Sequence, residues 1–462
     1  MLFKKILFHL FAAFILLIPA FYNGYPLVYS DTGSYLQSGM ELIIPEHRTI
    51  MYGLFIRFFS FNFSLWLVVF AQSLIVSYVL WYITKVCYRN ISKRLFLIIL
   101  AFLSGFTGLG WYASQIMPDI FTVTTVCILF LLAFKNDYKV YQKIIFSVVL
   151  VFSINAHFSN YLIAILTMLL LFVVTRTKFI PKAKKELSFL LPTIVISLSI
   201  LTGSLVNYTV GRTFKMNQGS HVFLMGKMLD SGVLKSFLDD ECKEDNYVLC
   251  QCKDSLPVNS RVLLWDTTSP LYKNGGWEDS QKPFNKILFD IFTSPKYLAL
   301  FTYNATTSSI TQLFQNDVGS GLISGWYKDP TSPPYSQIAK HFPFELNQYR
   351  QSRQNGNLWE QGLDFAFINY VNHILLVLSS VFLFFIFTSK SKRNSIAIPV
   401  QLIIVTLLLG VLTNAIVTAS LANVYDRLQA RISWTIIFCV VLILLSKKEY
   451  LSNKIEQFLA KK

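Results

Sequence analysis

Long apolar runs set between short polar connections constrain the fold of this chain more than any other feature. About 20 consecutive apolar residues are enough for a helix to cross the hydrocarbon core of a bilayer. The pattern predicts an all-α polytopic membrane protein with about ten transmembrane helices, near residues 5–22, 62–83, 95–112, 119–135, 143–157, 160–175, 187–206, 366–388, 396–419 and 432–447.

The composition and the placement of charge support this class. Of the 462 residues, 53% are hydrophobic and only 14% are charged, which is more apolar than a soluble core requires. The net charge of +16 does not indicate nucleic-acid binding, because Lys and Arg stand in short clusters between the apolar runs. These clusters occupy every second connection, starting at the N-terminus, so the positive-inside rule predicts that both termini are cytoplasmic.

The connections that lack basic clusters are predicted to lie outside the cytoplasm. The longest of them divides the chain into three parts. Residues 1–206 form a transmembrane module, whose first external loop contains PEHRTIMYGLFIRFFSF, a mixed apolar and basic segment typical of an interfacial helix. Residues 207–365 change abruptly to Trp, Asp, Asn, Gly and Pro, which predicts a large folded extracytoplasmic loop between the seventh and eighth helices. Residues 366–462 hold the last transmembrane helices and a short cytoplasmic tail.

Three of the six cysteines lie within the large loop. In an oxidising compartment we expect a disulfide from Cys242 to either Cys250 or Cys252. A metal site is the weaker interpretation, because neither the spacing nor a nearby pair of histidines supports tetrahedral ligation.

Two acidic residues are the main candidates for chemistry, because polar groups at the outer ends of membrane helices are costly without water, a partner or a function. Asp31 in VYSDTGSYL follows the first helix, with Tyr35 one helical turn later. Capping of an interfacial helix is the alternative role for Asp31. Asp119 follows Pro118 at the external mouth of the fourth helix, where a carboxylate also simply favours a helix N-terminus.

Cationic side chains on the same side are candidates for binding a phosphate. Arg48 suits a phosphate or lipid headgroup, with interfacial anchoring as the alternative. Arg427 and Arg431 stand four residues apart, so that one helix face could hold a phosphate or diphosphate. His157 lies in a tight external turn, where a structural hydrogen bond is the competing role, and His221 lies in the large loop.

This layout resembles the GT-C superfamily of integral-membrane glycosyltransferases, which use polyprenyl-phosphate-linked sugars. The similarity rests on YSDTGSYL after the first helix, an interfacial first loop, MPD in the second loop and the large loop, and it covers mainly residues 1 to about 210. The resemblance implies that Asp31 activates the acceptor as base and that Asp119 positions substrate or a metal. Because Ser30 precedes Asp31 where another acid is usual, a divalent cation is an optional component.

The resemblance further implies a bacterial inner-membrane enzyme that transfers a sugar to a glycan, lipid or protein acceptor at the outer face, with membrane lipids around it and no nucleic-acid partner. An O-antigen polymerase or ligase is one alternative and would rely on large-loop residues such as Arg212 and His221. A transporter or flippase of lipid-linked sugars is the other. The sequence shows no repeated halves, which disfavours it.

Overall fold

The computed structural model describes residues 2–180, 183–242, 247–323, 325–356 and 362–459, and within these ranges it contains helices and no β-strand. Six described helical segments are long and apolar enough to cross a membrane: α5 (Leu65–Cys87), α10 (Ser159–Arg176), α12 (Leu190–Gly211), α22 (Ala366–Thr388), α24 (Ile398–Leu421), and Asp426–Lys447, which joins α25 (Asp426–Ser433) to α26 (Thr435–Leu459). The all-α prediction is confirmed, and these six apolar segments mark a membrane protein.

The remaining four predicted spans take shorter or interrupted forms: α1 (Leu2–Leu16) with α2 (Ile18–Asn23), α6 (Lys93–Phe106) with α7 (Gly108–Ala113), α8 (Ile120–Ala133) and α9 (Val140–Ala156). The second pair breaks at Thr107, whose hydroxyl accepts the amide of Leu109 and so begins α7. At 1.5 Å per residue the 14 residues of α8 extend about 21 Å, less than the ~30 Å hydrocarbon core. The count of ten spans therefore stays a prediction.

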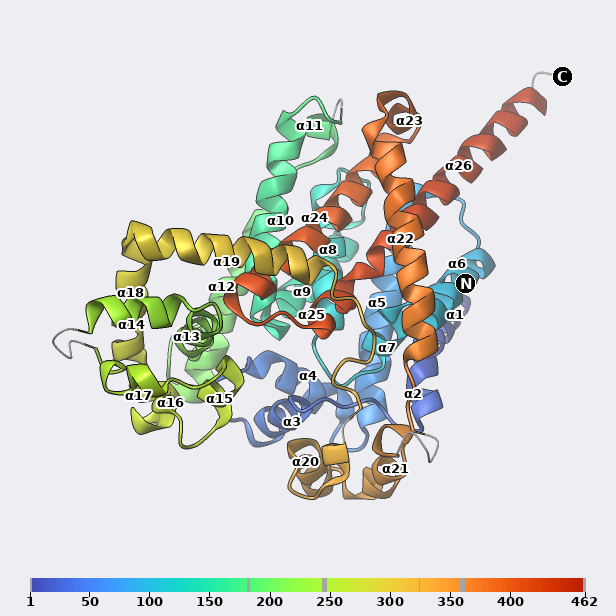
Figure 1. Cartoon of the computed structure of the whole chain (residues 1–462). Helices are drawn as coiled ribbons and strands as arrows, with labels where there is room; N and C mark the ends of the chain where they lie inside the picture. The colour runs from blue at the N-terminus through green and yellow to red at the C-terminus, as the bar shows by residue number, and fades with distance from the viewer. Residues whose placement is uncertain (1, 181–182, 243–246, 324, 357–361, 460–462) are drawn as a thin grey trace.

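Helix α8 is the centre of the bundle. Every one of its residues is buried, because α5, α9, α10, α12 and α24 pack around it (Figure 1). A helix that is apolar on all sides needs such an enclosure. The start of α8, and with it Asp119, is thereby fixed inside the molecule.

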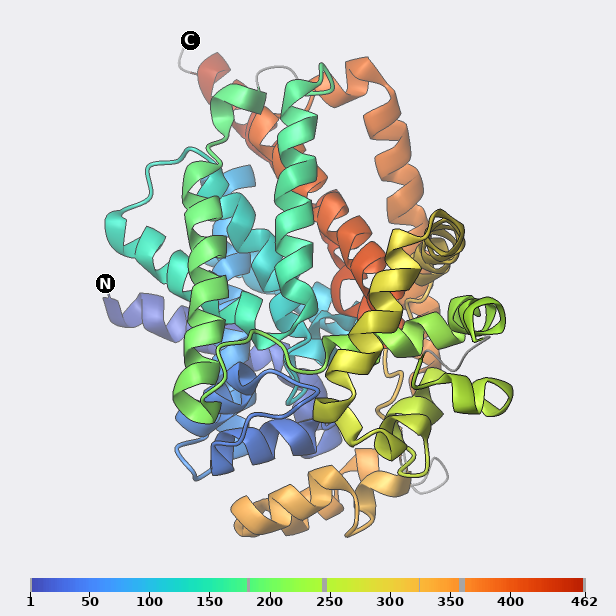
Figure 2. The ribbon, with the colours of Figure 1, turned by 90° about the vertical axis from the view of Figure 1, so that its left-hand side faces the viewer.

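The two ends of the bundle differ in composition. The short helices α11 (Ala183–Glu186) and α23 (Lys390–Asn394) carry Lys and Arg and lie at the top of Figures 1 and 2. At the opposite end, α3 (Thr32–Glu41) and α4 (Ile50–Ser60) lie in the segment predicted to be the first external loop, and they pack together through Gly39 and Gly53. A Cβ added at Gly39 would lie 2.0 Å from the Gly53 carbonyl oxygen, so this contact requires glycine.

The region 207–365 forms two groups of helices. The first, α13 (Ser220–Asp230), α14 (Val233–Glu241), η1 (Cys250–Ser255), α15 (Ser260–Trp265), α16 (Pro270–Lys273), α17 (Gly276–Asp279), α18 (Gln281–Thr293) and α19 (Pro295–Leu313), has its own apolar core that includes Met225, Phe237 and Phe284. It stands beside the bundle, and α19 packs along α24 (Figure 2). We call this group the side domain.

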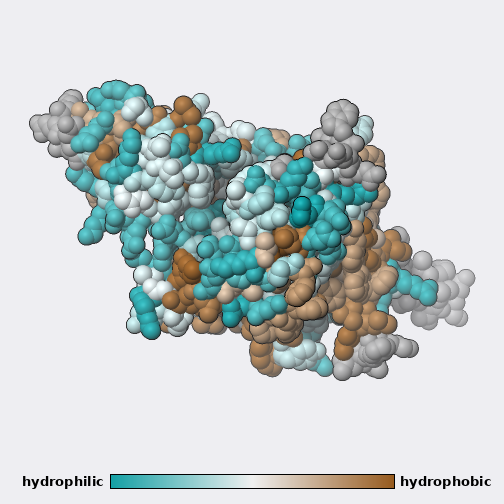
Figure 3. Space-filling model, turned by 90° about the horizontal axis from the view of Figure 1, so that it is seen from below, coloured by the Kyte–Doolittle hydropathy of each residue, from teal (hydrophilic) through white to brown (hydrophobic). Residues whose placement is uncertain are grey.

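The second group lies beneath the first loop and comprises η2 (Gly325–Lys328), α20 (Pro333–His341), η3 (Pro343–Glu345), α21 (Leu346–Arg350) and η4 (Arg353–Asn355). Its α20 packs on α3, and Glu345 accepts hydrogen bonds from the Tyr25 hydroxyl (2.8 Å) and the Leu65 amide (3.2 Å). Seen from below, hydrophilic side chains cover much of this face, and hydrophobic side chains gather along one flank (Figure 3).

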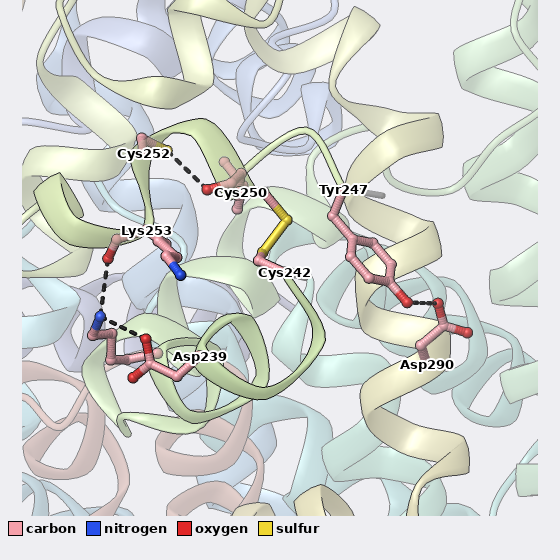
Figure 4. The surroundings of a disulfide bond; sticks show 9 residues. Asp239, Cys242, Tyr247, Cys250, Cys252, Lys253 and Asp290 are labelled. Carbon is pink, nitrogen blue, oxygen red and sulfur yellow. Dashed lines mark hydrogen bonds and ion pairs between the residues drawn. A yellow bond between two sulfur atoms is a disulfide. The ribbon is translucent and has the colours of Figure 1, made fainter. Parts of the chain in front are cut away.

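A disulfide joins Cys242 to Cys250 in the side domain (Figure 4). It decides between the two predicted pairings, because Cys252 is a free thiol that donates to the Leu249 carbonyl. Nearby, the Tyr247 hydroxyl donates to Asp290 at 2.9 Å and ties this region to α18.

Candidate functional site

Three segments that are distant in the sequence meet at the end of the bundle that carries α3 and α4. The amide of Leu27 donates to the chain at 114–116, and its carbonyl accepts an amide from the same stretch, at 3.0 and 2.8 Å. The Tyr112 hydroxyl donates to the carbonyl of Arg427 at 3.0 Å. These bonds bring the starts of α3, α8 and α25 together, and with them Asp31, Asp119, Arg427 and Arg431. Arg48, just before α4, joins them through Asp31, and we call these five residues the acid–arginine cluster.

Asp31 stands at the N-cap position of α3, but its side chain does not cap the helix. One carboxylate oxygen lies 2.7 Å from Nη2 of Arg48, and the other lies 3.3 Å from Nη1 of Arg427. Burial raises the pKa of a carboxyl, but these two guanidiniums outweigh it and hold the pKa of Asp31 well below its usual range. The three side chains remain 13–18% exposed, so water and ligands have access to them.

Asp119 stands at the N-cap position of α8 and also makes no capping bond. Its Oδ1 lies 3.1 Å from Nη1 of Arg431, and both side chains are at most 1% exposed. Burial raises the pKa of this carboxyl, but Arg427 and Arg431 lower it by a larger amount. The pKa of Asp119 is therefore below its ordinary value. The second carboxylate oxygen is buried and has no hydrogen-bond partner among the described residues.

The guanidinium of Arg431 has several side-chain partners besides Asp119. Its Nε and Nη2 donate to the side-chain oxygen of Asn414 at 3.2 and 2.8 Å, and Nη2 also donates to the Ser159 hydroxyl at 3.0 Å. That hydroxyl lies 2.8 Å from Nδ1 of His157, which accepts the Ser159 amide. Burial and the nearby Arg431 lower the pKa of His157 to about 3, so this histidine is neutral at physiological pH.

Arg427 and Arg48 are each fixed by a contact other than Asp31. The guanidinium of Arg427 lies over the ring of Tyr29 at 4.0 Å. Arg48 donates to the carbonyl of His47 at 2.7 Å and lies 5.9 Å from the ring of Phe223 in the side domain. The two guanidiniums are therefore positioned independently of the carboxylate between them.

The other predicted site residues have different surroundings. Tyr35 is buried in α3 with its ring edge-to-face on Tyr52, and burial raises the pKa of its phenol. His221 lies in the core of the side domain, where Nε2 contacts the Trp277 carbonyl and the Ser280 hydroxyl. The structure does not bring His221 to the acid–arginine cluster, so a role of His221 in substrate binding stays a prediction that is separate from this cluster.

The predicted partnership of Arg427 with Arg431 also differs in the structure. Although four residues apart on α25, they face different carboxylates, Asp31 and Asp119. Only Arg427 retains exposed surface, so a ligand that reaches α25 meets one of the two. Arg427 instead shares the carboxylate of Asp31 with Arg48, which lies just before α4.

Four further residues support the cluster and were missed by sequence reasoning: Tyr29, Tyr112, Ser159 and Asn414. Asn414 carried a usable signal, because it interrupts the apolar stretch LLLGVLTNAIV, and a polar group inside such a helix needs a partner. The other three are polar residues near helix ends, which is where such residues ordinarily occur.

The donor set does not fit a divalent cation. No group of three or more His, Cys, Asp or Glu side chains that could hold a metal lies within the described ranges. Both acids of the cluster face guanidiniums instead, which would repel a cation. Three arginines against two carboxylates leave this site with a net charge of +1, which favours an anion.

A cavity of about 510 Å³ lies elsewhere, between α22 and α26 near the basic end. It is lined by Phe382, Phe385, Ile386, Lys392, Ser395 and Lys447. No residue of the acid–arginine cluster lines it, so it is a separate feature.

Comparisons with known proteins give no match: no family model, no curated protein and no solved structure corresponds to this chain.

Proposed function

We propose that the protein is a membrane glycosyltransferase that moves a sugar from a polyprenyl-phosphate donor to an extracytoplasmic glycan, lipid or protein acceptor. The observation that carries the proposal is the accessible carboxylate of Asp31 between the guanidiniums of Arg48 and Arg427. A site with a carboxylate that can take a proton and cations that can hold a phosphate provides both groups that such a transfer needs.

The reaction follows from these groups. An acceptor hydroxyl gives its proton to the carboxylate of Asp31 as its oxygen attacks the anomeric carbon of the sugar. The bond from that carbon to the phosphate oxygen breaks, and the electron pair leaves with the polyprenyl phosphate. Arg48 and Arg427 stabilise the charge that develops on the leaving phosphate. The proton then passes from Asp31 to water, which restores the base.

Accessibility assigns the two acids different tasks. Asp31 keeps exposed surface, whereas Asp119 is enclosed together with Arg431. Asp31 is therefore the proposed base. Asp119 is a positioning residue that holds Arg431 and with it the start of α25, from which Arg427 projects. The transfer in this scheme involves no divalent cation, because neither carboxylate is free of arginine.

The proposed topology follows the charge pattern. With about ten spans, cytoplasmic termini and the basic connections on the inner face, the acid–arginine cluster lies at the outer face of a bacterial inner membrane. The disulfide between Cys242 and Cys250 supports an oxidising compartment for the side domain. Polyprenyl-phosphate sugars on the outer face are then within reach of the cluster.

The test is sugar transfer by the purified full chain in nanodiscs, with a panel of polyprenyl-phosphate sugars and released polyprenyl phosphate as the readout. Donor-dependent release that requires an acceptor supports the proposal, and no release with any donor contradicts it.

Arg212→Gln is the matched control, because Arg212 is an exposed arginine at the end of α12, outside the cluster. We expect full activity from this variant. Loss of activity would favour the polymerase or ligase alternative, and movement of the donor across liposomes without transfer would favour the flippase.

A further inference from the structure

The two guanidiniums that hold Asp31 are arranged as a site for an anion with two oxygens. Arg48 and Arg427 are separated by most of the chain, yet each meets a different oxygen of one carboxylate, at 2.7 and 3.3 Å. Two arginines that each donate to a different oxygen bind a phosphate group in the same way. The carboxylate of Asp31 therefore occupies the position that a phosphate would take.

The rest of the cluster limits where a phosphate can bind. Arg431 is enclosed and already satisfied by Asp119, Asn414 and Ser159. Only the pair Arg48 and Arg427 keeps exposed surface and faces a carboxylate that is itself exposed. The incoming group must therefore compete with Asp31 for this pair.

The contacts of each partner favour displacement of the carboxylate over displacement of the arginines. Arg427 keeps its stacking on Tyr29 and the Tyr112 bond to its carbonyl, and Arg48 keeps its bond to His47. The Asp31 side chain, by contrast, has these two guanidiniums as its only ion-pair or hydrogen-bond partners in the described part of the chain. When an anion binds the guanidiniums, the carboxylate loses both partners at once.

We propose that Asp31 is the resident occupant of a phosphate site and that the phosphate of the substrate displaces it, which releases the base only when the donor is bound. The inference rests on the proposed function for its biological meaning, but the displacement itself concerns binding alone. The donor's phosphate is a diester with one negative charge and two free oxygens, so it can replace the carboxylate of Asp31 oxygen for oxygen. Farnesyl phosphate and the released polyprenyl phosphate are monoesters with up to two negative charges and three free oxygens, so they compete more strongly for two arginines. Without a donor, Asp31 stays ion-paired and is a poor base.

The test is equilibrium binding of farnesyl phosphate to the full chain in nanodiscs, for the wild type and Asp31→Asn. If the carboxylate competes with phosphate, its removal raises the affinity, and we expect at least about tenfold tighter binding. Farnesol, which has the chain without the phosphate, should bind both proteins equally. Equal or weaker binding of farnesyl phosphate by Asp31→Asn would overturn the proposal.

Asp426→Asn is the matched control for charge. It removes one negative charge immediately beside Arg427, where Asp426 accepts the Asp317 amide and, within the residues that the structure describes, pairs with no arginine. We expect a change of less than about twofold, because the control leaves the phosphate site occupied. A gain equal to that of Asp31→Asn would mean that net charge alone controls the affinity, and it too would overturn displacement.

A second readout uses only the wild type and so survives a variant that fails to fold. Infrared difference spectra on addition of farnesyl phosphate should contain a carboxylate stretching band that shifts as the arginines leave Asp31. Spectra with phosphate bands and no carboxylate change would overturn the proposal. Displacement without sugar transfer would instead count against the proposed function alone, so the two failures can be told apart.

Discussion

Asp31 and Asp119 are the same residue type in nearly the same local setting, and they differ most in their exposure. Both stand at helix N-caps, neither caps its helix, and each pairs with an arginine of α25. The Asp31 group keeps 13–18% of its side-chain surface exposed, whereas Asp119 and Arg431 are at most 1% exposed. Access to water and ligand, and not the residue type, therefore separates a candidate for chemistry from a residue that stabilises the fold.

The largest expected effect is on stability and concerns the buried pair. Asp119→Asn leaves the guanidinium of Arg431 buried without its counterion, so we expect a loss of about 3–5 kcal/mol in the free energy of unfolding. Asp31→Asn should cost about 1 kcal/mol, because its partners reach solvent. Denaturant unfolding of both variants in one detergent measures the difference.

The double variant Asp119→Asn with Arg431→Met is the control for the buried charge, because it removes the uncompensated guanidinium. It should recover part of the lost stability. Equal losses for Asp31→Asn and Asp119→Asn would show that exposure does not separate the two groups.

The exposed arginines should affect turnover more than folding. Arg427→Gln and Arg48→Gln each remove a charged hydrogen bond to the phosphate, worth about 1.5–3 kcal/mol, so kcat/KM for sugar transfer should fall by about 10- to 100-fold. Arg427→Lys should lie between the glutamine variant and the wild type, because lysine keeps the charge but not the planar fork. Unchanged kcat/KM in the glutamine variants would remove the phosphate role.

A smaller effect is expected where the position of Arg427 is fixed. Tyr112→Phe loses the hydrogen bond that the Tyr112 hydroxyl donates to the Arg427 carbonyl. This bond is worth about 1 kcal/mol, so kcat/KM should fall by about fivefold. Tyr297→Phe is the matched control, because its hydroxyl donates to Asp240 in the side domain. The control should keep full activity, and a similar fall in both variants would argue for a general loss of folding.

The smallest expected effect is on the pH dependence of stability. The pKa of His157 is lowered to about 3 in the folded state, from a value near 6.5 in the unfolded state. As pH falls, His157 of the unfolded state therefore takes up its proton before His157 of the folded state does. His157 therefore makes stability fall as pH drops from about 6.5 toward 3. Melting temperatures of the wild type and His157→Gln at pH 7 and pH 5 check this, and the variant should lose less on acidification. A larger loss in the variant would contradict a neutral buried His157.

The sequence predicted the helical membrane class well, because apolar runs of sufficient length have few other solutions. It also selected Asp31, Asp119, Arg48 and Arg427 as site residues, since charged groups at the ends of apolar helices need partners. It could not predict that Arg427 shares a carboxylate with Arg48 and not with Arg431, because that depends on the rotation of α25 against α8 and α24. The interruptions at Thr107 and between α1 and α2 depend on packing for the same reason.

The contrast between the two acids is tested most directly by sugar transfer from Asp31→Asn and Asp119→Asn, measured side by side at a temperature where both are folded and corrected for the folded fraction. Loss of a general base costs about 10²- to 10⁴-fold, so kcat of Asp31→Asn should fall by that amount, whereas that of Asp119→Asn should fall by less than about tenfold. A larger loss in Asp119→Asn than in Asp31→Asn would contradict the assignment of Asp31 as the base.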